Sequence, residues 1–131
     1  MTVFVDTSAL YALLDEDDRN HEAAADLWRA TVPAADLTTH SYVVIETSAL
    51  VQRRLGMDAV GQLHDGLLAA VETAPVDITT HKVAVSRWRS IGRRDLSLVD
   101  ATSFVFMDES GIDWAFAFDD DFVDAGFKLI G

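Results

Sequence analysis

Residues 2–8 read Thr-Val-Phe-Val-Asp-Thr-Ser, and this order of a strand followed by a helix recurs along the rest of the chain. The β-branched and aromatic run over 2–5 predicts a buried strand, and Asp6 followed by Thr7 and Ser8 predicts the start of a helix directly after it. A strand that passes at once into a helix is the first half of a β–α–β unit. We therefore expect a sheet whose strands run parallel.

The alternation of strands and helices continues outward from this stretch. Further strands are predicted at 37–39, 76–79, 114–118 and 128–130. Helices are predicted at 9–14, 21–31, 41–55, 58–72, 81–94 and 98–109. The helix over 41–55 has Ser41 as its expected cap and ends before Gly56. The chain is 131 residues long and 50% hydrophobic, without repeats or linkers, so we expect one α/β domain over 1–131, with a mostly parallel sheet flanked by helices.

The composition excludes several classes of protein. There are 10 Lys and Arg against 22 Asp and Glu, a net charge of −12, so the mean field of the chain repels nucleic-acid phosphates. The absence of Cys removes disulfides, thiolate nucleophiles and zinc–thiolate sites. No apolar run approaches the roughly 18 residues of a membrane-spanning helix. We expect a cytoplasmic protein with no membrane association.

Two acidic residues follow predicted strands directly. Asp6 follows the strand over 2–5, and Asp119 follows the strand over 114–118. Ligands of open parallel sheets bind outside the carboxyl ends of the strands, which makes both residues candidates for a site. Taken singly, each is more simply interpreted as the cap of the following helix.

Two further acidic residues belong to predicted helices. The helical neighbours of Glu46 are apolar, so its carboxylate is expected on the buried face, either in a salt bridge with an arginine or in a site. Asp100 has capping-box spacing from Ser97, but it also shares a stripe with Phe104 and Met107, which points it inward. Four acids that converge in this way repel one another unless a cation compensates their charge. An all-oxygen ligand set selects Mg²⁺ or Mn²⁺, and a water held on such a cation is a natural nucleophile for phosphodiesters.

Four stretches in this order resemble the motifs of PIN-domain ribonucleases. They are Val5-Asp6-Thr7-Ser8-Ala9-Leu10, Val44-Ile45-Glu46-Thr47, Leu96-Ser97-Leu98-Val99-Asp100-Ala101 and Ala117-Phe118-Asp119-Asp120-Asp121-Phe122. In length and motif spacing the chain is most similar to the VapC-type toxins of toxin–antitoxin pairs. The resemblance implies a three-layer α/β/α fold with a five-stranded parallel sheet and Mg²⁺- or Mn²⁺-dependent cleavage of RNA. It also implies an antitoxin partner and a homodimer.

The resemblance also implies which residues form the site. The acidic quartet would be Asp6, Glu46, Asp100 and Asp119, which would act both as catalytic residues and as metal ligands. Asp6 and Asp100 would be the surest ligands, and Thr7 or Ser8 could add a hydroxyl around them. Three aspartates in succession depart from the usual family pattern, so Asp121 is either an alternative fourth member or an added ligand.

Two groups of residues outside the acids remain open. Five of the ten basic residues lie within 82–94. They form either a solvated helix face, with Ala84, Trp88 and Ile91 as its buried stripe, or a contact surface for RNA phosphates or an acidic partner. The histidines share no metal-binding spacing, so surface or helix-end roles are expected for His21, His40, His64 and His81.

Two other functions compete with the nuclease. A signalling receiver domain also places Asp at strand ends and binds Mg²⁺. It needs an acidic pair after the first strand, whereas Asp6 stands alone, Asp77 falls inside its predicted strand and Lys128 lies in a different context. A catalytically silent interaction module is the third alternative. Metal-dependent RNA cleavage or labelling by acetyl phosphate would distinguish the three.

Overall fold

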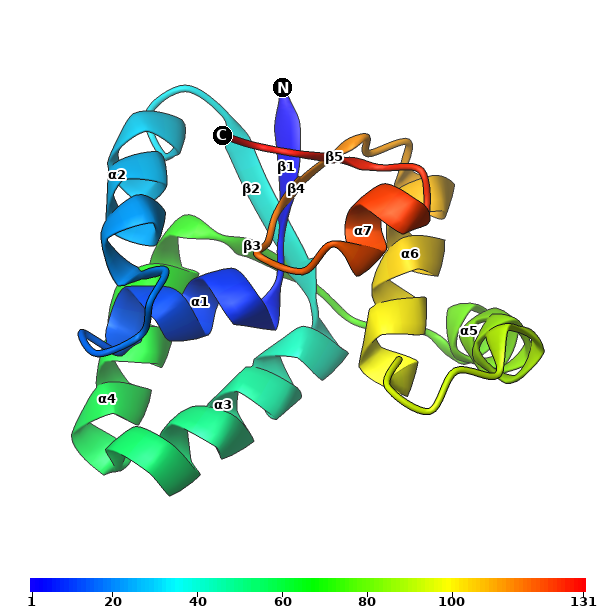
Figure 1. Cartoon of the computed structure of the whole chain (residues 1–131), viewed down its shortest axis with the longest axis horizontal. Helices are drawn as coiled ribbons and strands as arrows, with labels where there is room; N and C mark the ends of the chain where they lie inside the picture. The colour runs from blue at the N-terminus through cyan, green and yellow to red at the C-terminus, as the bar shows by residue number, and fades with distance from the viewer.

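The strands form one sheet between two groups of helices (Figure 1), in a computed structural model that describes all residues 1–131. The strands are β1 (Thr2–Val5), β2 (Asp36–His40), β3 (Glu72–Ala74), β4 (Trp114–Phe116) and β5 (Lys128–Leu129). Their order is β3-β2-β1-β4-β5, and all four neighbouring pairs are parallel. This confirms the predicted five-stranded parallel sheet.

The helices cover both faces of the sheet and complete three layers. In Figure 1, α1 (Thr7–Leu14), α2 (His21–Thr31) and α4 (Met57–Gly61) lie to the left of the strands, and α3 (Ser41–Leu55) lies below them. To the right lie α5 (Ile78–Ile91), α6 (Leu98–Ser110) and α7 (Asp121–Asp124). A π-helical turn, η1 (Gln62–Gly66), and a 3₁₀ turn, η2 (Leu67–Ala70), connect α4 to β3. None of the helices combines the length and the apolar character needed to cross a lipid bilayer.

The centre of the core is β1, which has a strand on each side and helices on both faces. Val3, Phe4 and Val5 have no exposed surface. The Phe4 ring stacks on His40 and packs against Phe122. Burial on both faces explains why 2–5 is a continuous apolar run rather than an alternating one.

The strand order brings the carboxyl ends of β1 and β4 side by side. The pairing of the two strands extends to Asp6, whose N–H donates to the Phe116 carbonyl at 3.0 Å. The turns that follow the two strands therefore meet at one edge of the sheet. This order also differs from the 2-1-3-4-5 order of receiver domains, which argues against that alternative.

Two predicted elements are wrong, and both lie between α3 and α5. The third strand is Glu72–Ala74 rather than 76–79, and Asp77 starts α5 by accepting the Thr80 N–H at 2.8 Å. An edge strand of three residues is defined by its pairing with β2, which local sequence does not reveal. The helix predicted over 58–72 is regular only to Gly61 and ends with η2, because Gly61 and Gly66 weaken helical structure.

Candidate active site

Asp6 lies at the end of β1 and caps α1, so both interpretations of this residue hold at the local level. Its carboxylate accepts from the Ser8 N–H at 3.2 Å and from the Ser8 hydroxyl at 2.7 Å. The residue is only 4% exposed. Burial raises the pKa of Asp6 to about 7 against the effect of the Ser8 hydrogen bonds, and the Asp100 and Glu46 carboxylates raise it further.

Ser8 also ties this turn to the segment after β4, because its hydroxyl accepts the Phe118 N–H at 3.0 Å. The neighbouring Thr7 hydroxyl accepts from Thr47 on α3 at 2.9 Å. The two hydroxyls after Asp6 thus join three elements around its carboxylate. Thr7 and Ser8 therefore lie beside the acidic residues.

Glu46 is half-buried on α3, and no lysine or arginine pairs with it. The alternative of a structural salt bridge is therefore wrong. Burial raises the pKa of Glu46, the Thr7 hydroxyl opposes this change, and the Asp100 carboxylate adds to it. A partly buried carboxylate beside another carboxylate either binds a proton or is stabilised by a cation.

Asp100 lies in the first turn of α6 and forms the predicted capping box. Its carboxylate accepts the Ser97 N–H at 3.2 Å, and the Ser97 hydroxyl accepts the Asp100 N–H at 3.0 Å. Phe104 and Met107, on the same stripe, are buried as expected. Burial raises the pKa of Asp100 although the Ser97 hydrogen bonds lower it. The capping role and an inward-facing position are therefore compatible.

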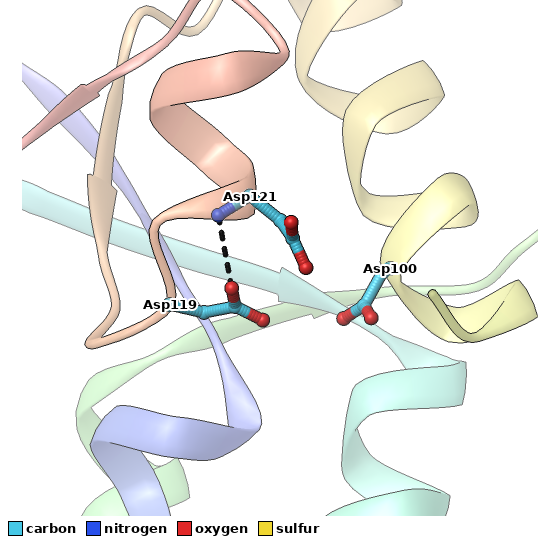
Figure 2. Close-up of side chains that lie close together, drawn as sticks. All are labelled: Asp100, Asp119 and Asp121. Atoms are coloured by element: carbon cyan, nitrogen blue, oxygen red, sulfur yellow. Dashed lines mark hydrogen bonds between the residues drawn. The ribbon is translucent and has the colours of Figure 1, made fainter. Parts of the chain in front are cut away.

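Asp119 lies in the turn that leads from β4 into α7, and Asp121 is the first residue of α7. Figure 2 shows both carboxylates directed toward Asp100, with the Asp121 N–H donating to Asp119 at 2.9 Å. Burial raises the pKa of Asp119, and the Asp121 and Asp100 carboxylates raise it further. Each of the three aspartates offers an oxygen within 4.8 Å of the other two. Asp119 and Asp121 thus lie in the same cluster and are not alternatives in space.

Asp6 and Glu46 are outside that three-residue group, although their carboxylates are coupled electrostatically to Asp100. The structure thus brings together all five predicted acids, with Asp100 as the common neighbour. The donor atoms are carboxylate oxygens, without histidine or cysteine, which suits a hard divalent cation. Mutual repulsion among acids with raised pKa values is the charge problem that such a cation would solve.

Arg93 is a neighbour of the site that sequence reasoning did not place there. Its guanidinium donates to Asp121 at 2.8 Å and to Asp95 at 2.9 and 3.1 Å. The contact with Asp121 joins the segment after α5 to the start of α7. No local signal marks it, because 28 residues separate Arg93 from Asp121.

His40 has one of the two expected roles, since it lies at a helix end, and it is also completely buried. It replaces Ser41 as the cap of α3, since its Nδ1 accepts the Tyr42 N–H at 3.2 Å and the Val43 N–H at 3.4 Å. The Ser41 hydroxyl instead accepts the Val76 N–H at 3.0 Å, from the segment after β3. Burial lowers the pKa of His40 to about 4, so the ring is neutral.

Comparison with known proteins supports the same family throughout. The PIN-domain family model matches residues 3–128. The chain is 38% identical over 128 residues to the 23S rRNA-specific endonuclease VapC20 of Mycobacterium tuberculosis, a match covering 95% of both chains. The crystal structure of that VapC20, a sarcin–ricin loop cleaving toxin, has a TM-score of 0.81 at 36% identity over 95% of each chain.

A more distant structure agrees in fold alone. VapBC2 from Rickettsia felis, crystallised bound to a fragment of promoter DNA, has a TM-score of 0.74 at 10% identity and covers 99% of this chain and 98% of its own. The motif resemblance, the matched family model and the strand order lead to one assignment: the chain belongs to the PIN-domain family, among its VapC-type members.

Proposed function

We propose that this chain acts as one domain over residues 1–131 and is a metal-dependent endoribonuclease, the toxin of a type II toxin–antitoxin pair. The carrying observation is that five carboxylates gather near the carboxyl ends of β1 and β4. Asp100, Asp119 and Asp121 each offer an oxygen within 4.8 Å of the other two, and burial raises the pKa values of Asp6, Glu46, Asp100 and Asp119. The relative VapC20 supports RNA as the substrate class, and ribosomal RNA is the first substrate to test.

We assign the cation, Mg²⁺ or Mn²⁺, to the carboxylates of Asp100, Asp119 and Asp121, with Asp6 and Glu46 completing the acidic surroundings. A divalent cation held there would offset the repulsion, attract an RNA phosphate and supply an activated water for its hydrolysis. An acidic chain with a net charge of −12 can accept a polyanion only if such a charge is supplied locally.

The residues of the chain orient these carboxylates before any ligand arrives. Ser8 holds Asp6 from its hydroxyl and its N–H, the Asp121 N–H holds Asp119, and the Ser97 N–H holds Asp100. Each carboxylate keeps a free oxygen or lone pairs for a ligand, because these contacts do not use all of its acceptor capacity. Oriented acceptors reduce the reorganisation that accompanies cation and substrate binding.

Two protein partners follow from the proposal. A second copy of the chain would cover exposed apolar side chains on α3 and α5, where Ile45 and Ile78 are each 65% exposed. The two helices are joined by a hydrogen bond of 2.7 Å between Tyr42 and His81, and each isoleucine lies one helical turn from it. The antitoxin is proposed because the relative VapC20 is a toxin. The apolar helix α1 gives little further support, because Ala9, Leu10 and Ala12 are buried within the chain itself.

The test is cleavage of RNA by the purified chain, freed of any bound partner, with Mg²⁺ or Mn²⁺ and with EDTA as the control. We expect cleavage only with metal. Glu46→Gln preserves the shape of the side chain and removes its charge, and turnover should fall about a hundredfold while the melting temperature stays close to the parent's. Glu22→Gln, an exposed change on α2, is the matched control and should have no effect. A parent chain that cuts no RNA under these conditions would contradict the proposal.

A further inference from the structure

The segment formed by α5 and the residues just after it holds the highest concentration of basic residues in the chain. Residues 78–94 hold five of the ten lysines and arginines and none of the 22 acids. Arg87 pairs with Asp108, and Arg93 pairs with Asp95 and Asp121, but Lys82, Arg89 and Arg94 form no ion pair. Unpaired cations on one surface of so acidic a chain leave their charge available to an anionic ligand.

Trp88 stands among these cations and is not the core residue that its position in the helix predicted. Of the expected buried stripe only Ala84 is buried; Trp88 is 36% exposed and Ile91 is 39% exposed. The indole N–H donates to the Leu96 carbonyl at 2.9 Å, which fixes the ring against the loop that leads into α6. An exposed indole held in place presents an aromatic surface with little side-chain freedom left to lose on binding.

A depression of about 260 Å³ runs beside this indole and is lined by Trp88, Arg89, Gly92, Arg93, Arg94 and Leu96. Arg93 and Leu96 also line a second depression, of about 350 Å³, that reaches Asp121. Because Arg93 donates to Asp121 at 2.8 Å, a single side chain separates the first depression from the acidic cluster. The first depression therefore borders the acidic cluster through Arg93.

We propose that Trp88, Arg89 and Arg94 form a nucleotide subsite beside the acidic cluster, called here the Trp88 subsite. An unpaired base of the RNA stacks on the indole, and the phosphates on either side of it contact the two arginines. The inference rests on the proposed ribonuclease function and adds to it where the strand next to the scissile phosphate is held. It also decides between the two interpretations of the basic segment that the sequence left open.

The combination of groups favours single-stranded RNA over an acidic peptide. Cations alone would serve either ligand, but a fixed aromatic surface between cations is the arrangement that binds unstacked bases. Stacking requires that the base is not paired, so loops and single strands fit the subsite whereas duplexes do not. An acidic peptide is therefore retained as an outcome of the test.

The binding experiment uses the full chain carrying Asp100→Asn, which prevents cleavage, and a labelled single-stranded RNA of about 12 nucleotides. In this background Trp88→Ala should weaken RNA binding about tenfold or more, while Trp88→Phe, which retains a ring, should lose less. Arg89→Gln and Arg94→Gln should each lower the slope of log affinity against log salt by about 0.7. Arg19→Gln, an exposed and unpaired cation between α1 and α2, is the matched control and should change neither quantity.

Stacking itself is tested with a strand of the same length that lacks bases. The parent should bind this abasic strand about tenfold more weakly than the normal strand, and Trp88→Ala should bind the two alike. RNA should also quench tryptophan emission in the parent and not in Trp88→Phe. Circular dichroism and melting curves check that each variant is folded.

The outcomes separate this inference from the proposed function. If Trp88→Ala binds RNA as the parent does, or loses equal affinity for both strands, the subsite is wrong even if the parent cleaves RNA normally. Tighter binding of a polyglutamate peptide than of RNA, lost in Trp88→Ala, would also overturn it in favour of a protein partner. A parent that cleaves no RNA contradicts the proposed function, and the binding comparison still decides the subsite.

Discussion

Asp6 and His40 occupy equivalent places in adjacent strand-to-helix turns, yet their surroundings differ in one decisive respect. Each ends a strand in an extended conformation, accepts backbone N–H groups at the start of a helix and is almost completely buried. His40 is neutral, and burial lowers its pKa to about 4. Asp6 faces Glu46 and Asp100, and burial raises its pKa to about 7.

The hydrogen bonds of His40 form a complete network. Its Nδ1 accepts from Tyr42 and Val43, so Nε2 carries the proton and lies 2.9 Å from the Ser103 hydroxyl, which itself donates to the Val99 carbonyl at 3.0 Å. Nothing in this network calls for a ligand. Asp6 has the same cap geometry with uncompensated charge around it, so the comparison separates a structural cap from a functional one by electrostatics rather than by backbone shape.

The largest expected effect is on catalysis and comes from replacing Asp6, the functional cap of the two. Asp6→Asn should lower RNA cleavage by about a thousandfold, because a charge in the acidic site is lost. Without metal the variant should melt at the parent's temperature or above it, since the change relieves repulsion and Asn remains a good cap. Cleavage assays and melting curves measure both quantities. If Asp6→Asn unfolds, Asp6 is mainly structural.

His40→Ala removes the structural cap and should lower stability rather than activity. The free energy of unfolding should fall by about 3 to 4 kcal/mol, because the change opens a cavity and leaves N–H groups at the start of α3 without their acceptor. Urea denaturation measures this loss. Cleavage per folded molecule should stay within about threefold of the parent. Such a change is easily distinguished from the loss of about a hundredfold or more that is expected when a catalytic acid is replaced. Loss of activity in a fully folded His40→Ala would show that the two caps are not functionally separate.

The pH dependence of stability also distinguishes the two caps, because a histidine whose pKa is lowered on folding makes the folded state less stable as the pH falls. Neutral His40 contributes its full stability above pH 6.5, the ordinary value, and this contribution is lost as the pH falls toward 4. The loss should reach about 3 kcal/mol, from a pKa lowered by about 2.5. His40→Asn keeps a cap acceptor and should remove this dependence.

The control for that measurement is the difference between parent and His40→Asn at each pH. The raised pKa of Asp6 has the opposite sign, because a carboxyl that binds its proton more tightly when folded stabilises the chain as the pH falls below about 7. Both proteins share this contribution, so it cancels in the difference. A difference that does not change between pH 7 and 4.5 would contradict the assignment of His40 as a neutral buried cap.

The smallest expected effect is stabilisation by a metal ion, which tests whether the clustered carboxylates bind a cation. Mn²⁺ at about 100 times its dissociation constant should stabilise the parent by about 2.7 kcal/mol through binding to the folded state. Asp100→Asn should lose most of this stabilisation, since Asp100 neighbours all the other acids. His40→Asn should retain it. Equal stabilisation of parent and Asp100→Asn in thermal melts would place the metal elsewhere.

Much of the fold follows from local sequence because its strongest elements are locally consistent. The run over 2–5 is apolar because β1 is buried on both faces, and the helix over 98–109 has a capping box and a C-terminal glycine that mark α6 almost to the residue. The acids could be selected one by one, because ligands of parallel sheets bind at the carboxyl ends of the strands and because a carboxylate on an apolar helix stripe needs a partner. The basic segment and Trp88 could not be interpreted, since a helix position alone does not say what covers it.

The sequence by itself determined most of the strands and helices, their alternation, and the presence of acids at or shortly after the ends of β1 and β4. Only the tertiary structure decided that β3 is Glu72–Ala74, that His40 rather than Ser41 caps α3, and that Arg93 reaches Asp121. The physical reason is range. Propensity, capping and periodicity act over a few residues, whereas an edge strand, a buried network and an ion pair depend on groups brought together from distant parts of the chain.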